Sequence, residues 1–245
     1  MTRILVISDI HANLTALEAV IADAGPIDET WCLGDLIGYG PDPNECISMI
    51  RELPNLFCMM GNHDLAATGE IELTAFNNNA LRSLLWHKNE LSQMNLEFLN
   101  ELPSKTQVIG DVTLVHGSPR DPIWEYIMNP VTAEKNMSFF DTQFCFFGHT
   151  HHPACFYWPP GDEEPVHEIT KSIVSSEPMV GRAFLNPGSV GQPRDRDPRA
   201  SYAIYDPQNK TWQAKRVVYD HKQVQERILM TALPPHNANR LGDGT

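Results

Sequence analysis

The first sixty residues alternate between short apolar runs and amphipathic segments. Residues 4–7 form a continuous apolar run, typical of a strand that is buried on both faces. Across residues 13–24 the apolar positions recur at helical spacing instead. Two further strands are predicted at 31–33 and 56–60, with a helix at about 43–51 between them. This alternation of strand and helix is the pattern of an α/β fold.

The pattern changes after residue 65. Residues 65–101 are predicted to be mostly helical, with an interruption at Asn77-Asn78-Asn79. The rest of the chain is richer in short apolar runs separated by turn residues, and these predict strands at 112–115, 144–147, 154–158, 182–185, 202–205 and 212–218. Neither an internal repeat nor a linker interrupts the chain. We therefore expect a single domain over 1–245, an exposed loop at 159–165 and a poorly ordered tail at 234–245.

Polar side chains follow five of these predicted strands, directly after each apolar run. The segments are Asp9-Ile10-His11, Gly34-Asp35, Gly61-Asn62-His63-Asp64, His116-Gly117 and Gly148-His149-Thr150-His151. The carboxyl ends of strands are where α/β sheets bind ligands. Carboxylate and amide oxygens combined with imidazole nitrogens suit Mn, Fe, Zn or Co better than Ca. One such segment arises readily by chance, whereas five in succession predict a metal centre.

In the same order, these segments resemble the motifs of the calcineurin-like metallophosphoesterases. The resemblance runs from Arg3 to about Val218. It implies an α/β fold with four layers, an α-β-β-α sandwich of two mixed β-sheets flanked by helices. It also implies a dinuclear metal site at the ends of the sheets.

The resemblance further implies a role for each polar residue. Asp9, His11 and His151 would hold the first metal ion, and Asn62, His116 and His149 would hold the second. Asp35 would bridge both, which is reasonable because one carboxylate can join two cations roughly 3.5–4 Å apart. The cofactors would be two divalent transition-metal ions, Mn foremost, with Fe, Zn, Co or Ni as alternatives.

Two ions in such a site would make a bridging hydroxide available near neutral pH and would stabilise the charge that develops on a phosphoryl group. His63 is then the candidate donor of a proton to the leaving alkoxide. We expect Asp64 to orient the imidazole of His63 and to favour its protonated form. The alternative for His63 is a structural histidine behind the ligands.

Composition narrows the range of partners. The formal net charge of −13 argues against a stable nucleic-acid complex, which requires clusters of Lys and Arg. The five cysteines form no CxxC pair and lie beside apolar residues, so we expect buried, reduced thiols and a reducing compartment. No run is long enough to cross a membrane, and cytoplasmic localisation is therefore expected. Whether the chain is a homo-oligomer stays open.

One departure bears on the substrate. Many members of the family, notably the Ser/Thr protein phosphatases, follow the Gly-Asp motif with Asp-Arg-Gly, but here Leu36-Ile37-Gly38 follows. This difference and the segment Asn186-Pro187-Gly188-Ser189-Val190-Gly191 resemble the small prokaryotic phosphodiesterase branch. Arg120 or Arg194 could supply the missing positive charge to the substrate. Trp124 and Tyr126 could stack on an aromatic group of the substrate or simply pack.

These observations favour a phosphodiesterase that hydrolyses small phosphate esters or nucleotides. The alternatives are a phosphomonoesterase, a dinucleoside polyphosphate hydrolase or a Ser/Thr protein phosphatase. An inactive metal-binding scaffold is disfavoured because the full set of ligands is present together with His63.

Overall fold

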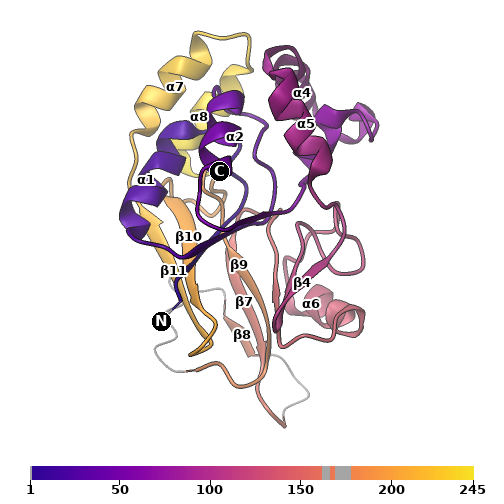
Figure 1. Ribbon diagram of the computed structural model, residues 1–245. Helices are drawn as coiled ribbons and strands as arrows, with labels where there is room; N and C mark the ends of the chain where they lie inside the picture. The colour runs from indigo at the N-terminus through magenta and orange to yellow at the C-terminus, as the bar shows by residue number, and fades with distance from the viewer. Residues whose placement is uncertain (1, 162–165, 169–177) are drawn as a thin grey trace.

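The chain, seen here as a computed structural model that describes residues 2–161, 166–168 and 178–245, is built on two β-sheets (Figure 1). The first has the strand order β11-β10-β1-β2-β3, with β1 (Ile4–Ile7), β2 (Glu29–Cys32), β3 (Leu56–Cys58), β10 (Ala200–Asp206) and β11 (Thr211–Val217). The second has the order β4-β5-β6-β9-β7-β8, with β4 (Gln107–Ile109), β5 (Val112–Leu114), β6 (Phe144–Phe146), β7 (Pro153–Trp158), β8 (Val166–Glu168) and β9 (Arg182–Pro187).

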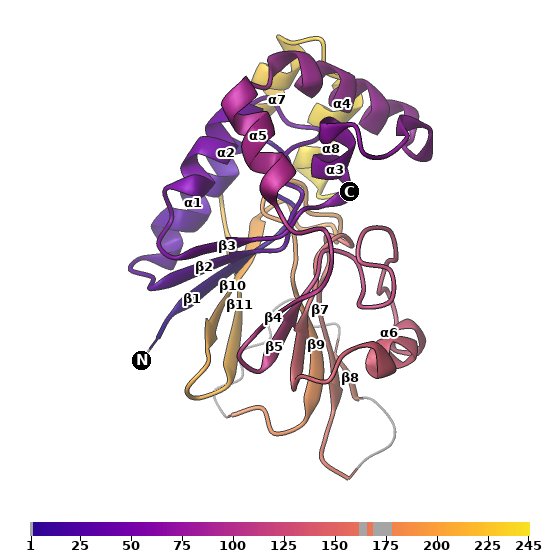
Figure 2. The same ribbon diagram turned by 45° about the vertical axis from the view of Figure 1, so that its right-hand side comes forward.

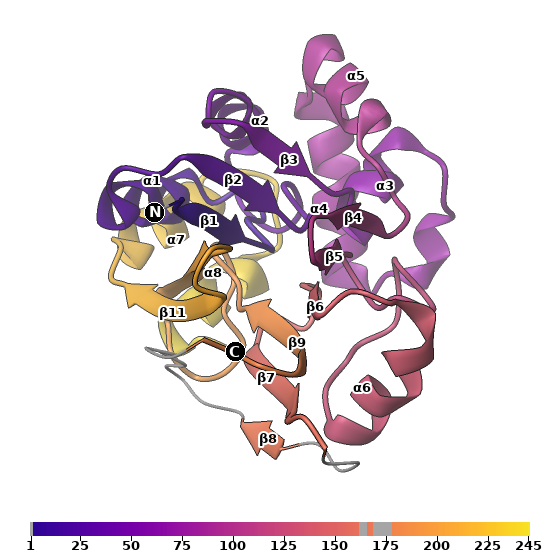
Figure 3. The same cartoon turned by 60° about the horizontal axis from the view of Figure 1, so that its bottom comes forward.

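Helices cover the outer faces of both sheets, which confirms the expected four layers (Figure 2). The first sheet is covered by α1 (Leu14–Ala24), α2 (Pro43–Arg51), α7 (His221–Leu229) and α8 (Pro235–Asp243). The part of the chain that connects β3 to β4 forms α3 (Asn62–Thr68), η1 (Leu73–Ala75), α4 (Asn78–Glu90) and α5 (Gln93–Glu101). Beside the second sheet lie α6 (Pro130–Asn136) and η2 (Met137–Phe139), as the view in Figure 3 shows for α6.

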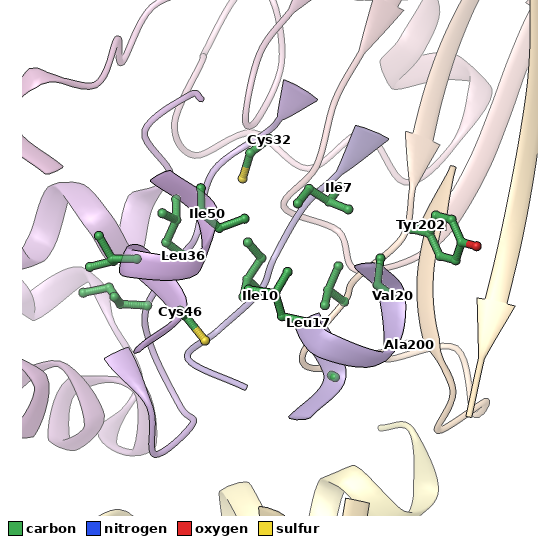
Figure 4. Packing of buried hydrophobic residues seen from close by; sticks show 14 of the residues in the cluster. Ile7, Ile10, Leu17, Val20, Cys32, Leu36, Cys46, Ile50, Ala200 and Tyr202 are labelled. Carbon is green, nitrogen blue, oxygen red and sulfur yellow. The ribbon is translucent and has the colours of Figure 1, made fainter. Parts of the chain in front are cut away.

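One face of strand β1 packs against helix α1, which accounts for half of the apolar residues at the start of the chain. Leu5 and Ile7 of β1 belong to the same buried cluster as Leu17 and Val20 of α1. Figure 4 shows Ile7, Leu17 and Val20 as members of this cluster. Each side chain of this kind contributes about 1.5–3 kcal/mol when it is fully buried.

The other face of the same strand packs between the two sheets. Ile4 and Val6 are buried there with Phe146 of β6 and Trp212 of β11. Successive side chains of a strand point to opposite faces, so β1 needs apolar residues at every position. Cys145 faces the other way, into a third cluster under α6.

The parallel strands bring the five polar segments to one end of the molecule. In the first sheet, β1, β2 and β3 run parallel to one another, and in the second β5, β6 and β9 do so. Their carboxyl ends therefore lead into loops on the same edge of each sheet. All five cysteines are buried and free, as the sequence predicts.

The end of the chain differs from expectation, because residues 235–243 form helix α8 instead of a poorly ordered tail. Asn237, Ala238 and Leu241 of this helix are buried. The Asn237 side chain donates hydrogen bonds to the Tyr39 carbonyl and to the Ser83 hydroxyl, at 2.9 and 2.8 Å. With so few apolar positions, α8 depends on these tertiary contacts, which the sequence pattern does not reveal.

Strand β4 differs from the sequence pattern, and the predicted loop before β8 is only partly described. The expected loop at 159–165 lies largely outside the described residues, and strand β4 was not predicted because its three residues are partly exposed and form no apolar run. Among the helices that the structure describes, none is both long and apolar enough to cross a lipid bilayer.

Candidate metal centre

Polar side chains that follow five strands of the two sheets meet at the carboxyl ends of these strands. Two overlapping groups of possible ligand atoms lie there, one made of Asp9, His11, Asp35 and His151 and the other of Asp35, His116 and His149. Within each group, the ligand atoms all lie within 4.8 Å of one another. Asp35 belongs to both groups.

The first group is centred on two imidazoles. The Nε2 atoms of His11 and His151 are 3.1 Å apart. Asp9 Oδ1 lies 3.4 Å from His151 Nε2, and Asp35 Oδ2 lies 3.6 Å from His11 Nε2. All four side chains are buried.

The second group is equally close. His116 Nε2 lies 3.5 Å from Asp35 Oδ2 and 3.2 Å from His149 Nδ1. Asn62 Oδ1 approaches the same His116 nitrogen to 3.1 Å. The structure thus brings together all seven residues that the sequence predicts as ligands.

The outer nitrogen of each imidazole is held by a backbone carbonyl. The Nδ1 atoms of His11, His116 and His151 lie 2.9, 2.8 and 2.6 Å from the carbonyls of Ile37, Leu33 and Gln192. A carbonyl can only accept, so these nitrogens carry the proton and donate it. The Nε2 lone pairs are then left facing the cluster, which is the arrangement of metal-binding histidines.

This donor set fits a cation. Two lone pairs that face each other at 3.1 Å, as on His11 and His151, repel unless a positive charge lies between them. The buried Oδ1 atom of Asp9 also has no hydrogen-bond partner among the residues that the structure describes. A metal ion in the first group would satisfy all three atoms together.

The pKa shifts of the buried Asp and His side chains are also consistent with a bound cation. Burial raises the pKa of Asp9 to about 7, with Asp35 adding to the effect, and it raises the pKa of Asp35 well above its usual range. Burial also lowers the pKa values of His11, His149 and His151. These three imidazoles would therefore be neutral as ligands, and the two carboxylates would need a neighbouring cation to be fully ionised.

The backbone is strained at the same place. Five of the seven predicted ligands have positive φ angles, namely Asp9, His11, Asp35, His149 and His151. Conformations of this kind are costly for residues other than glycine and gather at functional sites. Gly61 shows how tight the packing is, since a Cβ atom there would lie 2.1 Å from Asp35 Oδ1.

His63 lies beside the first group, but Asp64 does not orient it, which corrects our expectation. The Asp64 carboxylate accepts hydrogen bonds from the backbone N–H groups of Leu36, Ile37 and Gly61. It therefore fixes the loop after Asp35 to the start of α3. His63 Nδ1 is buried without a partner among the described residues, and burial and the charge of Arg194 lower the pKa of its imidazole.

The two candidate arginines are in different situations. Arg120 forms an ion pair with Glu125, its Nε lying 2.8 Å from Oε2, and its positive charge is thereby compensated. Arg194 is half-buried, and its guanidinium contacts the Tyr39 hydroxyl at 3.5 Å and Gln192 Oε1 at 3.0 Å. Its charge is among the influences that lower the pKa values of Asp9 and Asp35, so it lies near the two ligand groups.

The loop that carries Tyr39 is held by residues that the sequence analysis missed. We call Gly38, Tyr39 and Gly40 the Tyr39 loop. His87 of α4 is completely buried, accepts from the Gly38 N–H at 2.9 Å and donates to the Gly40 carbonyl at 2.8 Å. Tyr39 has a φ of 61°, and its ring lies 4.8 Å from those of both His11 and His63. Only the fold brings α4 to this loop.

Comparison with known proteins agrees with the geometry. The family model of the calcineurin-like phosphoesterase superfamily domain matches residues 2–210. The chain belongs to this superfamily. It is also 38% identical, over 98% of its length and 97% of the relative's, to an uncharacterized protein of Methanocaldococcus jannaschii.

Solved structures of this superfamily fold show the same agreement. A metallophosphoesterase from Sphaerobacter thermophilus is 44% identical, with a TM-score of 0.86 over 100% of this chain and 99% of that one. A hypothetical protein from Pyrococcus horikoshii is 21% identical, with a TM-score of 0.80 over 100% and 99% of the two chains, and shares the fold. Membership confirms the expected family and fold and makes the chain a phosphoesterase-family hydrolase with a cluster suited to divalent metal.

Proposed function

We propose that the chain is a phosphodiesterase that acts on small phosphate esters or nucleotides with the help of two divalent transition-metal ions, Mn(II) foremost. The observation that carries the proposal is the presence of two ligand groups that share Asp35. Asp9, His11 and His151 would hold one ion, and Asn62, His116 and His149 the other. Bound there, two cations would supply Lewis acidity, which lowers the pKa of water and offsets charge on the phosphoryl group.

The side chains around the ligands would position the substrate and move its protons. Arg194 lies beside Tyr39, and its buried Nε atom lacks a partner among the described residues, so the guanidinium would donate to a phosphoryl oxygen. His63 would donate a proton to the leaving oxygen. Since Asp64 is committed to backbone N–H groups, the negative charge of the bound phosphate is what would favour the protonated imidazole.

The test is turnover of bis-p-nitrophenyl phosphate by the Mn(II)-loaded protein, with p-nitrophenyl phosphate and a dinucleoside polyphosphate as competing substrate classes. Asp35→Asn should lower the diesterase rate by roughly a thousandfold, since it removes the charge shared by both groups. Asp111→Asn is the matched control, because Asp111 pairs with Lys210 on the surface. Unchanged turnover in Asp35→Asn would show that Asp35 does not hold the ions. A strong preference for the monoester would replace the proposed diesterase by a phosphomonoesterase.

A further inference from the structure

A chain of aromatic rings borders the metal centre on the side of His63. The His63 ring lies 5.1 Å from Phe76, in an edge-on arrangement, and Phe76 lies 5.3 Å from Trp124. The Trp124 carbonyl in turn lies 3.3 Å from His149 Nε2, and the Tyr126 ring stacks on His149 at 3.9 Å. We call Phe76, Trp124 and Tyr126 the aromatic wall. It connects the proposed proton donor to a predicted ligand of the second ion.

Core packing does not account for the aromatic wall. None of its three residues belongs to the three buried clusters of the part of the chain that the structure describes. Phe76 and Trp124 are half-buried, and Tyr126 is 47% exposed. Aromatic surface that stays in contact with water beside a binding site is available to a ligand.

Hydrogen bonds of Glu125 fix the segment that carries Trp124 and Tyr126. Glu125, between Trp124 and Tyr126, accepts hydrogen bonds from Ser118 Oγ at 2.7 Å and from Asn136 Nδ2 at 2.8 Å, besides its pair with Arg120. The Arg120 hydrogen bond, followed by those of Asn136 and Ser118, lowers the pKa of Glu125 to about 2. The Glu125 carboxylate is thus fully occupied by its own loop and by α6, and the rings of Trp124 and Tyr126 are presented on a fixed segment.

The position of the wall identifies the part of the substrate that it would contact. The His63 ring contacts the ring of His11 in the first group and stands at one end of the wall, so a leaving group on this side of the site lies along Phe76 and Trp124. Arg194 lies beside Tyr39 and Gln192 instead. The cation nearest to the wall in sequence, Arg120, is neutralised by Glu125. The leaving-group side therefore suits a neutral planar group better than a chain of further phosphates.

From this arrangement we propose that the substrate is a phosphodiester whose leaving group is a nucleoside, with its base packed against Phe76 and Trp124. This inference rests on the proposed function. In the reaction, the oxygen of water forms a bond to phosphorus as the bond from phosphorus to the nucleoside oxygen breaks. His63 gives its proton to that oxygen, and the proton lost by water returns the imidazole to its charged form. The products are a nucleoside and a phosphate monoester.

The experiment compares two diesters that differ only in the base. One is the methyl ester of adenosine 5′-monophosphate, and the other is the methyl ester of 1-O-methylribose 5-phosphate, whose leaving oxygen is equally basic. A stacked base should raise kcat/KM roughly tenfold, mainly through KM. Phe76→Leu and Trp124→Leu should each bring the ratio of the two kcat/KM values to within about threefold of one. Any disturbance of His63 affects both diesters and cancels in this ratio.

Phe139→Leu is the matched control, because Phe139 is 54% exposed on η2 and lies outside the wall, and its ratio should equal that of the wild type. Calorimetry gives a readout that needs no turnover: adenosine 5′-monophosphate should bind more tightly than ribose 5-phosphate, and Trp124→Leu should remove the difference. Equal kcat/KM values for the two diesters in the wild type would overturn the stacking proposal alone. If the wild type also fails to hydrolyse bis-p-nitrophenyl phosphate, both the proposed function and the stacking proposal are overturned.

Discussion

His87 gives a sharp test of how the Tyr39 loop is held in place. Both nitrogens of its neutral ring are used, one accepting from Gly38 and the other donating to Gly40. Protonation would place a second N–H against the N–H of Gly38. Burial accordingly lowers the pKa of His87 from 6.5 to about 4. The perturbation to make is His87→Gln, which keeps a polar side chain but cannot take up a proton.

The sign and size of the effect follow from this difference in pKa. Between about pH 4 and 6.5, the unfolded chain binds a proton at His87 that the folded chain does not. The contribution of His87 to the free energy of unfolding is therefore complete above about pH 6.5 and is lost as the pH falls toward 4. At about 1.4 kcal/mol per pH unit, the loss amounts to about 3 kcal/mol.

The assay is thermal unfolding of the metal-free protein at pH 7, 6, 5 and 4. About 3 kcal/mol corresponds to roughly 6–12 °C in Tm for a chain of this size. We expect the wild type to lose that much more than His87→Gln between pH 7 and pH 4. His63, the titratable neighbour whose pKa also responds to His87, is present in both proteins. His236→Gln, which removes an exposed histidine, should behave like the wild type. Parallel pH profiles for the wild type and His87→Gln would refute the reasoning.

Four further predictions concern the site and the Tyr39 loop beside it. Elemental analysis after reconstitution with Mn(II) should find close to two ions per chain, and fewer than one would contradict the proposal of two bound ions. His63→Ala should slow esters with poor leaving groups at least tenfold more than those with good ones, and equal losses would exclude proton donation. Arg194→Ala should raise KM by roughly tenfold to a hundredfold and by at least fivefold more than Arg120→Ala, whereas a larger effect of Arg120→Ala would reverse their assignment. Asn237→Ala should leave the metal content unchanged but lower kcat/KM several-fold through the Tyr39 carbonyl that it holds; unchanged kcat/KM would show that α8 does not support the site.

The sequence by itself determined the frame of this protein. Strands buried on both faces must be apolar at every position, and residues 4–7 show this directly, as do the helical spacing of 13–24 and the polar residues that follow the strands. Because parallel strands end at a common edge, the order of these segments also indicated which side chains would meet. The predicted ligands accordingly lie together in the structure.

Tertiary structure decided everything that depends on partners distant in sequence. Asp64 binds backbone N–H groups of a loop that precedes it by nearly thirty residues, so its spacing from His63 was misleading. Arg120 and Arg194 look alike in the sequence, yet only Arg120 is neutralised by a carboxylate.

His87 and Asn237 follow no motif, because their role is to reach the Tyr39 loop from other helices. Helix α8 is too poor in apolar residues to be predicted without those contacts. Local periodicity thus predicts most of the strands and helices. The pairing of buried polar groups, and elements such as α8 that depend on it, are set by contacts that form only when the chain is folded.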